Sequence, residues 1–239
     1  MRSTPRQDDA IKTGEAGGSA PSCGYPRPYY QRDGITIYHG DCLEILPAIG
    51  KADAIVTDPP FNAGKDIEND NLSPKDFRAF CCKLAVAAYE SGIPNAVIEV
   101  GKNDIIMRQE FERWMEFRYS ICLNYTNSMR NGAVGYANWG LALWFSNGGK
   151  CHNRYKDRID SALHSTKGDF EHPSPKEVGH YSRLVSMFTP SGGTVVDPFM
   201  GSGTTLLACK AEGRRAVGIE IEERYCEIAA KRLSQGVLF

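Results

Sequence analysis

A strand, a glycine-rich loop, a helix and a second strand follow one another near the end of the chain, and this unit constrains the fold most. The first strand is the apolar run Thr194–Asp197, and the second, Ala216–Ile219, ends in Glu220. Between them a helix is expected over residues 204–212, with Gly213 as its C-terminal cap. Because strands joined by a crossover helix run parallel in one sheet, the unit predicts two parallel strands.

The same alternation of strands and helices extends over most of the chain. Short apolar runs predict strands, and apolar residues at helical spacing predict helices. Strands are expected over residues 35–38, 54–58, 96–100, 120–125 and 141–145, and helices over 43–46, 74–90, 103–115, 175–188 and 222–233. This order predicts an α/β fold with a doubly wound, mainly parallel sheet.

The sequence Asp58-Pro59-Pro60-Phe61 directly follows one of these apolar runs. Proline cannot continue the hydrogen-bond ladder of a central strand, so the strand is expected to end at Asp58. Its carboxylate then lies at the edge where open α/β sheets bind ligands. The prolines also fix the direction of the Pro59 carbonyl. Two acceptors beside the Phe61 ring suit a flat group that carries an amine; an ordinary turn with a packed phenylalanine is the alternative.

The loop after Asp197 combines glycines with acids. Glycines let the backbone approach a ligand closely, and an acid such as Glu220 can bind both hydroxyls of a ribose. Leu206 stands where the dinucleotide fingerprint has its third glycine, and no Gly-Lys-Ser/Thr phosphate loop occurs. Asp197 would repel a phosphate and attract a cation. The loop therefore favours a positively charged nucleoside such as S-adenosylmethionine; a glycine turn that serves only helix packing is the alternative.

Together, Asp58–Phe61 and Asp197–Thr205 resemble the paired signatures of the amino-group DNA methyltransferases, which make N6-methyladenine or N4-methylcytosine. The catalytic motif precedes the cofactor loop, as in the permuted beta group of that family. The resemblance extends from about Ile35 to Leu233. It implies a seven-stranded methyltransferase sheet with a short basic recognition insertion, S-adenosylmethionine as the cofactor and double-stranded DNA as the substrate.

The resemblance also implies roles for individual residues. Asp41 matches the acid near the adenine of the cofactor, and Glu220 matches the ribose ligand. The run His172–Lys176 resembles a motif near the methionine end, although Glu177 replaces a usual proline. The expected catalytic residues are Asp58, Pro59, Pro60 and Phe61, and the expected cofactor-binding residues are Asp41, Cys42, Ser174, Lys176, Asp197, Pro198, Phe199, Gly201, Ser202, Gly203, Thr204, Thr205 and Glu220.

The implied reaction moves a methyl group to the exocyclic amine of a flipped base. Asp58 and the Pro59 carbonyl would hold that amine while Phe61 stacks on the base. N6 of adenine is the favoured target, with N4 of cytosine, RNA methylation or a silent DNA-binding relative as alternatives. A C5-cytosine methylase needs a cysteine nucleophile after proline, and no Pro-Cys occurs. A Rossmann-type oxidoreductase is disfavoured by Leu206.

The expected domain organisation has two parts. Residues 1–29 are rich in glycine, serine and proline and are expected to be a disordered tail. Residues 30–239 are expected to form one methyltransferase domain. Its catalytic half covers 30–145, its recognition segment 146–171 and its cofactor-binding half 172–239.

The positive charge of the chain is concentrated near this recognition segment. Residues 127–170 carry six Lys or Arg against three Asp, whereas the whole chain has a net charge of −1. Such a patch suits a polyanion, and a solvated loop is the alternative. The expected DNA-binding residues are Arg130, Lys150, Arg154, Lys156 and Arg158.

Composition sets the remaining expectations. The eight cysteines never occur as Cys-x-x-Cys, no ligand pair has zinc spacing, and neither a metal nor disulfides are expected. No apolar run is long enough for a membrane span or resembles a signal peptide, so a cytoplasmic location is expected. A homodimer and a cognate restriction endonuclease remain open.

Overall fold

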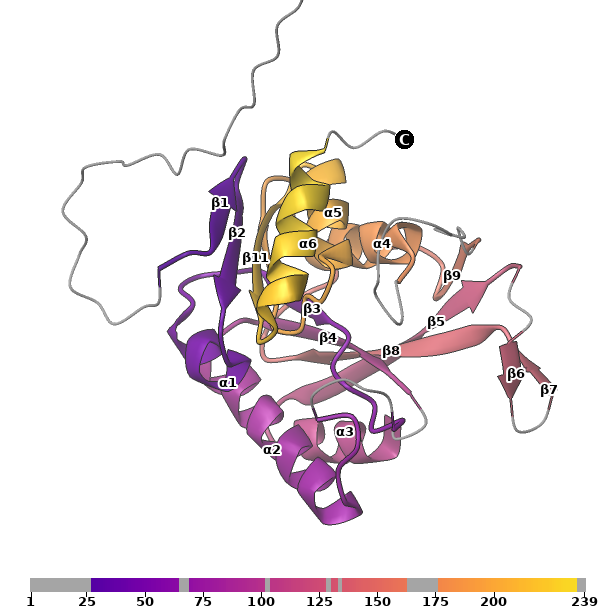
Figure 1. Ribbon diagram of the computed structural model, residues 1–239. Helices are drawn as coiled ribbons and strands as arrows, with labels where there is room; N and C mark the ends of the chain where they lie inside the picture. Colours follow the sequence, from indigo (N-terminus) through magenta and orange to yellow (C-terminus); the bar gives the residue numbers. More distant parts are fainter. Residues whose placement is uncertain are drawn as a thin grey trace, which may run out of the picture.

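The computed structural model describes residues 27–64, 69–101, 104–127, 130–132, 135–162 and 176–235. Within these residues a mixed β-sheet is covered by helices on both faces (Figure 1). The predicted tail lies outside them up to residue 26. No helix in these ranges has the length and apolar character that a bilayer span requires.

In this part of the chain, nine strands form one sheet, and two more form a separate hairpin. The order across the sheet is β1 (Tyr30–Arg32), β2 (Ile35–His39), β11 (Arg215–Glu220), β10 (Thr194–Asp197), β3 (Ala54–Thr57), β4 (Asn95–Val100), β8 (Trp139–Ser146), β5 (Glu116–Tyr125) and β9 (Arg158–Ser161). The hairpin pairs β6 (Arg130–Gly132) with β7 (Gly135–Ala137).

Five neighbouring strands run parallel, namely β2, β11, β10, β3 and β4. Their carboxyl ends therefore meet at one edge, which we call the carboxyl edge. Strand β8 runs antiparallel to both β4 and β5, so its first residue, Trp139, and the last residue of β5, Tyr125, lie at that edge too. The predicted doubly wound, mainly parallel sheet is confirmed, with β1 and β9 added outside the seven expected strands.

The helices form two layers because the parallel strands are apolar on both faces. One layer contains α1 (Cys42–Ile45), α2 (Pro74–Glu90) and α3 (Asp104–Glu112), with the short helix η1 (Leu46–Ala48) after α1; the other contains α4 (Val178–Phe188), α5 (Thr204–Ala211) and α6 (Glu223–Ser234). Successive residues of β3 serve opposite layers: Ile55 packs in the core under α2, and Val56 packs in the core under α4.

The predicted helix starts and strand ends agree with the structure to within a few residues. At α2 the expected cap is present: Ser73 Oγ accepts a hydrogen bond from the Asp76 amide at 3.2 Å. Three features were not predicted, namely β1, the β6–β7 hairpin and β9. Strand β9 lies within the expected recognition segment, residues 146–171, where it pairs in parallel with β5.

Candidate active site

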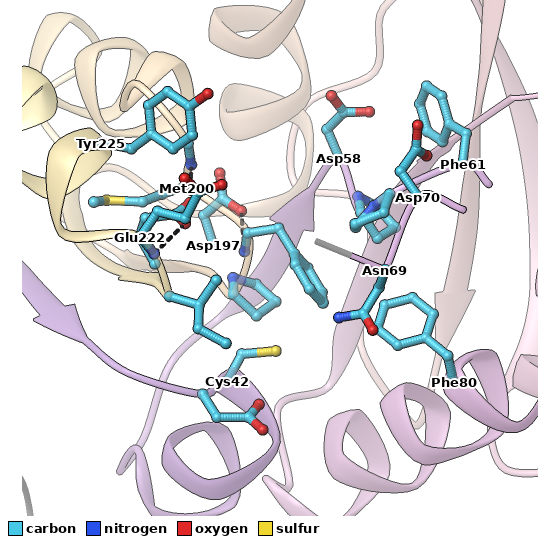
Figure 2. A pocket seen from close by; sticks show the side chains of 18 of the residues that line it. Cys42, Asp58, Phe61, Asn69, Asp70, Phe80, Asp197, Met200, Glu222 and Tyr225 are labelled. Atoms are coloured by element: carbon cyan, nitrogen blue, oxygen red, sulfur yellow. Dashed lines mark hydrogen bonds between the residues drawn. The ribbon is translucent and has the colours of Figure 1, made fainter. Parts of the chain in front are cut away.

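A cavity of about 470 Å³ opens at the carboxyl edge. Segments that follow β2, β3, β10 and β11 line it, as expected for a doubly wound sheet. Figure 2 shows Asp58 and Phe61 on one side of this cavity and Asp197, Glu222 and Tyr225 on the other. The predicted residues at its wall are Asp41, Cys42, Asp58, Pro59, Pro60, Phe61, Lys176, Asp197, Pro198, Phe199, Gly201, Ser202, Thr204, Thr205 and Glu220. Ser174 lies outside the described residues.

The two sequence motifs meet because β3 and β10 are neighbours in the sheet. The hydroxyl of Thr57, the last residue of β3, donates a hydrogen bond of 2.6 Å to Asp197 Oδ1, across 140 positions of sequence. The catalytic motif and the cofactor loop are therefore held together directly, rather than merely facing each other across a cleft.

The side chain of Asp58 is only 24% exposed. Burial raises the pKa of this carboxyl to about 7, against the attraction of the Lys176 ammonium. That ammonium lies 3.0 Å from Asp58 Oδ1 as an ion pair. The carboxylate of Asp58 is consequently more basic than that of an exposed aspartate.

Lys176 lies beside the catalytic motif. Its ammonium contacts Asp58, Glu99 and the ring of Phe61, whose centroid is 4.8 Å away, and the role near the methionine end of the cofactor stays a prediction. The pKa of Lys176 is lowered by burial, but the two carboxylates outweigh burial and leave it raised. Lys176 therefore lies at the wall of the cavity on the catalytic side.

Glu99 is a site residue that sequence reasoning missed. It belongs to β4, is 5% exposed, and pairs with the Lys176 ammonium at 2.5 Å. The hydroxyl of Tyr181 donates a hydrogen bond of 2.8 Å to its other oxygen. A single acid inside the apolar run Ala96–Val100 is the signal that could have identified it, since a buried charge requires a partner.

Gly101, directly after β4, makes room for Phe61. A Cβ atom at this position would lie 2.8 Å from Phe61 Cγ, too close for any real contact. Only glycine therefore allows the aromatic ring to pack against this end of β4.

We expect Gly101→Ala to displace the Phe61 ring and to lower the methyl transfer that the resemblance implies by about tenfold or more, because small misplacements of a reacting group are costly. Cofactor affinity should stay within a factor of about two. Gly50→Ala is the matched control, since no atom lies within 4 Å of its added Cβ. Steady-state methylation of DNA by both variants provides the measurement, and equal rates for the two would contradict the packing role.

At the start of the cofactor loop, the side chain of Asp197 is buried and holds the loop by hydrogen bonds. It is 3% exposed, and its Oδ1 accepts hydrogen bonds from the Thr57 hydroxyl and, at 3.1 Å, from the Phe199 amide. Burial raises its pKa to about 6, with hydrogen bonds from Thr205 and Thr57 opposing that shift. Asp197 thus has a structural role, and attraction of a cation, the role expected from the sequence, stays a prediction.

Glu220, at the end of β11, receives two backbone amides. Its Oε2 accepts from Gly201 at 3.0 Å and its Oε1 accepts from Glu222 at 2.9 Å. Burial raises the pKa of this carboxyl. Each carboxylate oxygen has a second lone pair, so the group is oriented and can still accept from the two hydroxyls of a ribose.

Helix α6 packs on the glycine loop and shapes it. This contact was not evident from the sequence. Gly203 has φ +83°, and a Cβ there would meet Ala229 Cβ of α6 at 2.9 Å. Arg232 of the same helix donates hydrogen bonds to the Ser202 carbonyl at 2.6 Å and to its hydroxyl at 2.9 Å. Gly203 and Ser202 therefore fix the loop on α6, and Gly203 does not line the cavity.

In the part of the wall that follows β2, Asp41 caps helix α1. Its Oδ1 accepts a hydrogen bond of 2.8 Å from the Leu43 amide. Cys42 is buried, and burial raises the pKa of its thiol, which stays protonated.

The predicted basic patch is not brought to the cavity. The Lys150 carbonyl accepts from Asn95 at 3.3 Å, and Asn95 begins β4, so Lys150 lies at the edge of the sheet opposite the carboxyl edge. Residues 152 and 153 bond to Met187 and Ser186 at the end of α4, and the chain then runs through Arg154 and Lys156 to the start of β9, where Arg158 pairs with Cys122 of β5. Arg158 begins β9 and pairs with Asp160 at 2.8 Å. Arg130 lies in β6, and its side chain is outside the described part of the structure.

The fold and the site define a class, the S-adenosylmethionine-dependent methyltransferases. At the carboxyl edge of this sheet, the glycine loop after β10 and Glu220 at the end of β11 share a cavity with the acid Asp58 after β3. A family model for N6 and N4 methyltransferases, described as DNA methylase, matches residues 52–231. The chain belongs to this family, and the predicted resemblance is confirmed.

Individual relatives agree with this assignment. The type II methyltransferase M.ScaI of Streptomyces caespitosus is 30% identical over 260 residues, which cover 87% of this chain and 84% of the relative. The crystal structure of an M1.HpyAVI–SAM complex is 28% identical with a TM-score of 0.65, and the match covers 83% of this chain and 98% of that one. PvuII DNA methyltransferase, titled cytosine-N4-specific, matches in fold with a TM-score of 0.72 at 18% identity, covering 89% and 90% of the two chains.

Proposed function

We propose that this DNA methyltransferase transfers the methyl group of S-adenosylmethionine to the exocyclic amine of a base flipped from double-stranded DNA. The observation that carries the proposal is the buried acid Asp58, held beside the cofactor loop by the 2.6 Å hydrogen bond between Thr57 and Asp197. We take N6 of adenine as the first target and N4 of cytosine as the alternative, since both amines present the same donors to Asp58.

The cofactor fits the residues present at the cavity. The oriented carboxylate of Glu220 suits the ribose, the wall at Asp41 and Cys42 suits the adenine, and the loop 197–202 suits the methionine portion. When bound, S-adenosylmethionine supplies an electrophilic methyl group on a sulfonium. We include Lys176, near the methionine end, and Asp197, which would attract the positive charge of the cofactor, in the same proposal.

The catalytic residues act on the base. Asp58 accepts a hydrogen bond from the amine, and the Pro59 carbonyl accepts the second. Both bonds draw the nitrogen lone pair out of conjugation with the ring and aim it at the methyl carbon. Phe61, seated against Gly101, stacks on the base and keeps water away. Orientation of this kind supplies roughly 7–11 kcal/mol in favourable cases, so positioning can account for most of the catalysis.

The direct test is incubation with methyl-labelled S-adenosylmethionine and DNA, followed by mass spectrometry of the nucleosides. Labelled N6-methyladenine is expected. N4-methylcytosine alone would support the alternative target, and the absence of both from DNA would overturn the proposal. A parallel incubation with RNA separates the two nucleic acids.

We further propose that the duplex approaches the carboxyl edge, where Trp139 is 58% exposed. Trp139→Ala is expected to weaken DNA binding by about tenfold, as loss of an aromatic contact to bases costs roughly 1–3 kcal/mol. Trp114→Ala is the matched control, because this exposed tryptophan precedes β5 at the opposite edge. Fluorescence anisotropy with labelled duplex provides the measurement. A larger loss in the control, or in Lys150→Ala, would place the DNA at the other edge.

A further inference from the structure

A cluster of three charges, one buried and two half-buried, lies at the catalytic end of the cavity. Asp58 follows β3, Glu99 lies in β4, and Lys176 precedes α4, with side chains that are 24%, 5% and 15% exposed. With both carboxylates ionised the cluster carries a net charge of −1. Buried charges are costly unless paired, so an excess negative charge here calls for a functional reason.

The ammonium of Lys176 is shared unequally between the two acids. It donates to Glu99 Oε1 at 2.5 Å, whereas it lies 3.0 Å from Asp58 Oδ1. The second oxygen of Glu99 accepts from Tyr181, so both of its oxygens are occupied inside the protein. Asp58 Oδ1 is buried yet accepts no hydrogen bond of good geometry from the described residues. Asp58 lines the cavity, and without such a bond its carboxylate retains acceptor capacity.

Glu99 is 5% exposed, and the residues that line the cavity include Asp58 and Lys176 but not Glu99. Its effect on the reaction must pass through Lys176. If Glu99 were absent, the ammonium would pair with Asp58 alone and weaken the carboxylate as an acceptor for the amine of the base.

We infer that Glu99 is a positioning residue for the proposed amine methylation: it holds the Lys176 ammonium back, so that Asp58 keeps an oxygen for the amine and accepts its proton. The inference rests on the proposed function. As the amine nitrogen bonds to the methyl carbon, the methyl–sulfur bond breaks with its electron pair on sulfur. The nitrogen then releases one proton to Asp58, and the net charge of the cluster changes from −1 to zero.

The charges that face Asp58 come from several elements. Lys176 lowers its pKa, while Glu99 of β4 and Asp197 of β10 raise it. Tyr181 of α4 faces Glu99, and Tyr125 of β5 faces Lys176. Removing the charge of Glu99 should therefore lower the pKa of Asp58, and removing that of Lys176 should raise it. A purely structural role would shift neither.

The experiment titrates Asp58 by NMR in the full chain labelled with carboxyl-13C aspartate, without DNA or cofactor. Asp58→Asn identifies its signal. The wild type is compared with Glu99→Gln, Lys176→Gln and Tyr181→Phe, the last of which removes a hydrogen bond to Glu99 without changing charge. The pH profile of kcat with DNA is measured on the same proteins.

In the wild type, Asp58 should titrate well above an ordinary aspartate. Its titration and the acidic limb of kcat should move to lower pH in Glu99→Gln and to higher pH in Lys176→Gln, with Tyr181→Phe closer to the wild type. An unchanged Asp58 titration in Glu99→Gln, or an equal shift in Tyr181→Phe, overturns the inference. If a variant fails to fold, the wild type alone decides: an ordinary pKa for Asp58 overturns the inference, and a raised pKa supports it. Absence of methylation by the wild type overturns the proposed function instead, and the titration still shows whether Glu99 controls the charge of Asp58.

Discussion

Replacement of Asp58 by alanine is expected to abolish methyl transfer while leaving S-adenosylmethionine binding largely intact. The variant loses the only side-chain acceptor that the catalytic motif offers to the amine, whereas the Pro59 carbonyl and Phe61 remain. Loss of one preorganised electrostatic contact typically costs about 10²–10³-fold in kcat. Loss of the proton acceptor adds to this, so turnover should fall by at least about 10³-fold. Single-turnover methylation and calorimetry of cofactor binding measure the two quantities separately.

Asp58→Asn is the informative companion, since it keeps the shape and one carbonyl oxygen but has no charge. It should remain at least about 10²-fold below the wild type, because an amide is a poor proton acceptor. Undiminished turnover in either variant would remove Asp58 from the mechanism. A large loss of cofactor affinity in both would instead assign the residue to the cofactor site.

Glu220→Ala is expected to act on the cofactor and not on the base. Hydrogen bonds to a charged group contribute about 1.5–3 kcal/mol each, so loss of the ribose contacts should weaken binding by about 10²-fold or more. The same change leaves the Gly201 and Glu222 amides without their acceptor, which loosens the loop. Glu220→Gln retains one oxygen and should lose less. Calorimetric titration with S-adenosylmethionine measures the affinities, and unchanged values would refute the ribose role.

The two motifs could be predicted to converge because local signals specify each of them. Prolines end β3 at Asp58, a glycine loop ends β10 at Asp197, and parallel strands bring such ends to one edge. The direction of β8 could not be predicted, since an apolar strand reads the same way whether it runs parallel or antiparallel.

Residues whose role depends on packing between distant elements were not predictable. Gly101 matters only because Phe61 lies over it, and Arg232 matters only because α6 packs on the glycine loop. The basic patch shows the converse: its charge is evident in the sequence, but the edge of the sheet at which Lys150 lies depends on the pairing of β4 with β8. Charge density alone does not specify a face of the molecule.

The order of the strands has a consequence for how the protein is made. Strands β2 and β3 are synthesised early, yet they are separated in the sheet by β10 and β11, which come from residues 194–220. Until the ribosome has released that last part, β2 and β3 each have one edge without a hydrogen-bonded neighbour, and their apolar side chains are not fully covered. Such edges invite pairing with other chains. The centre of this sheet is therefore completed last, and nascent chains that stall before residue 194 should be the species that depend on chaperones and aggregate.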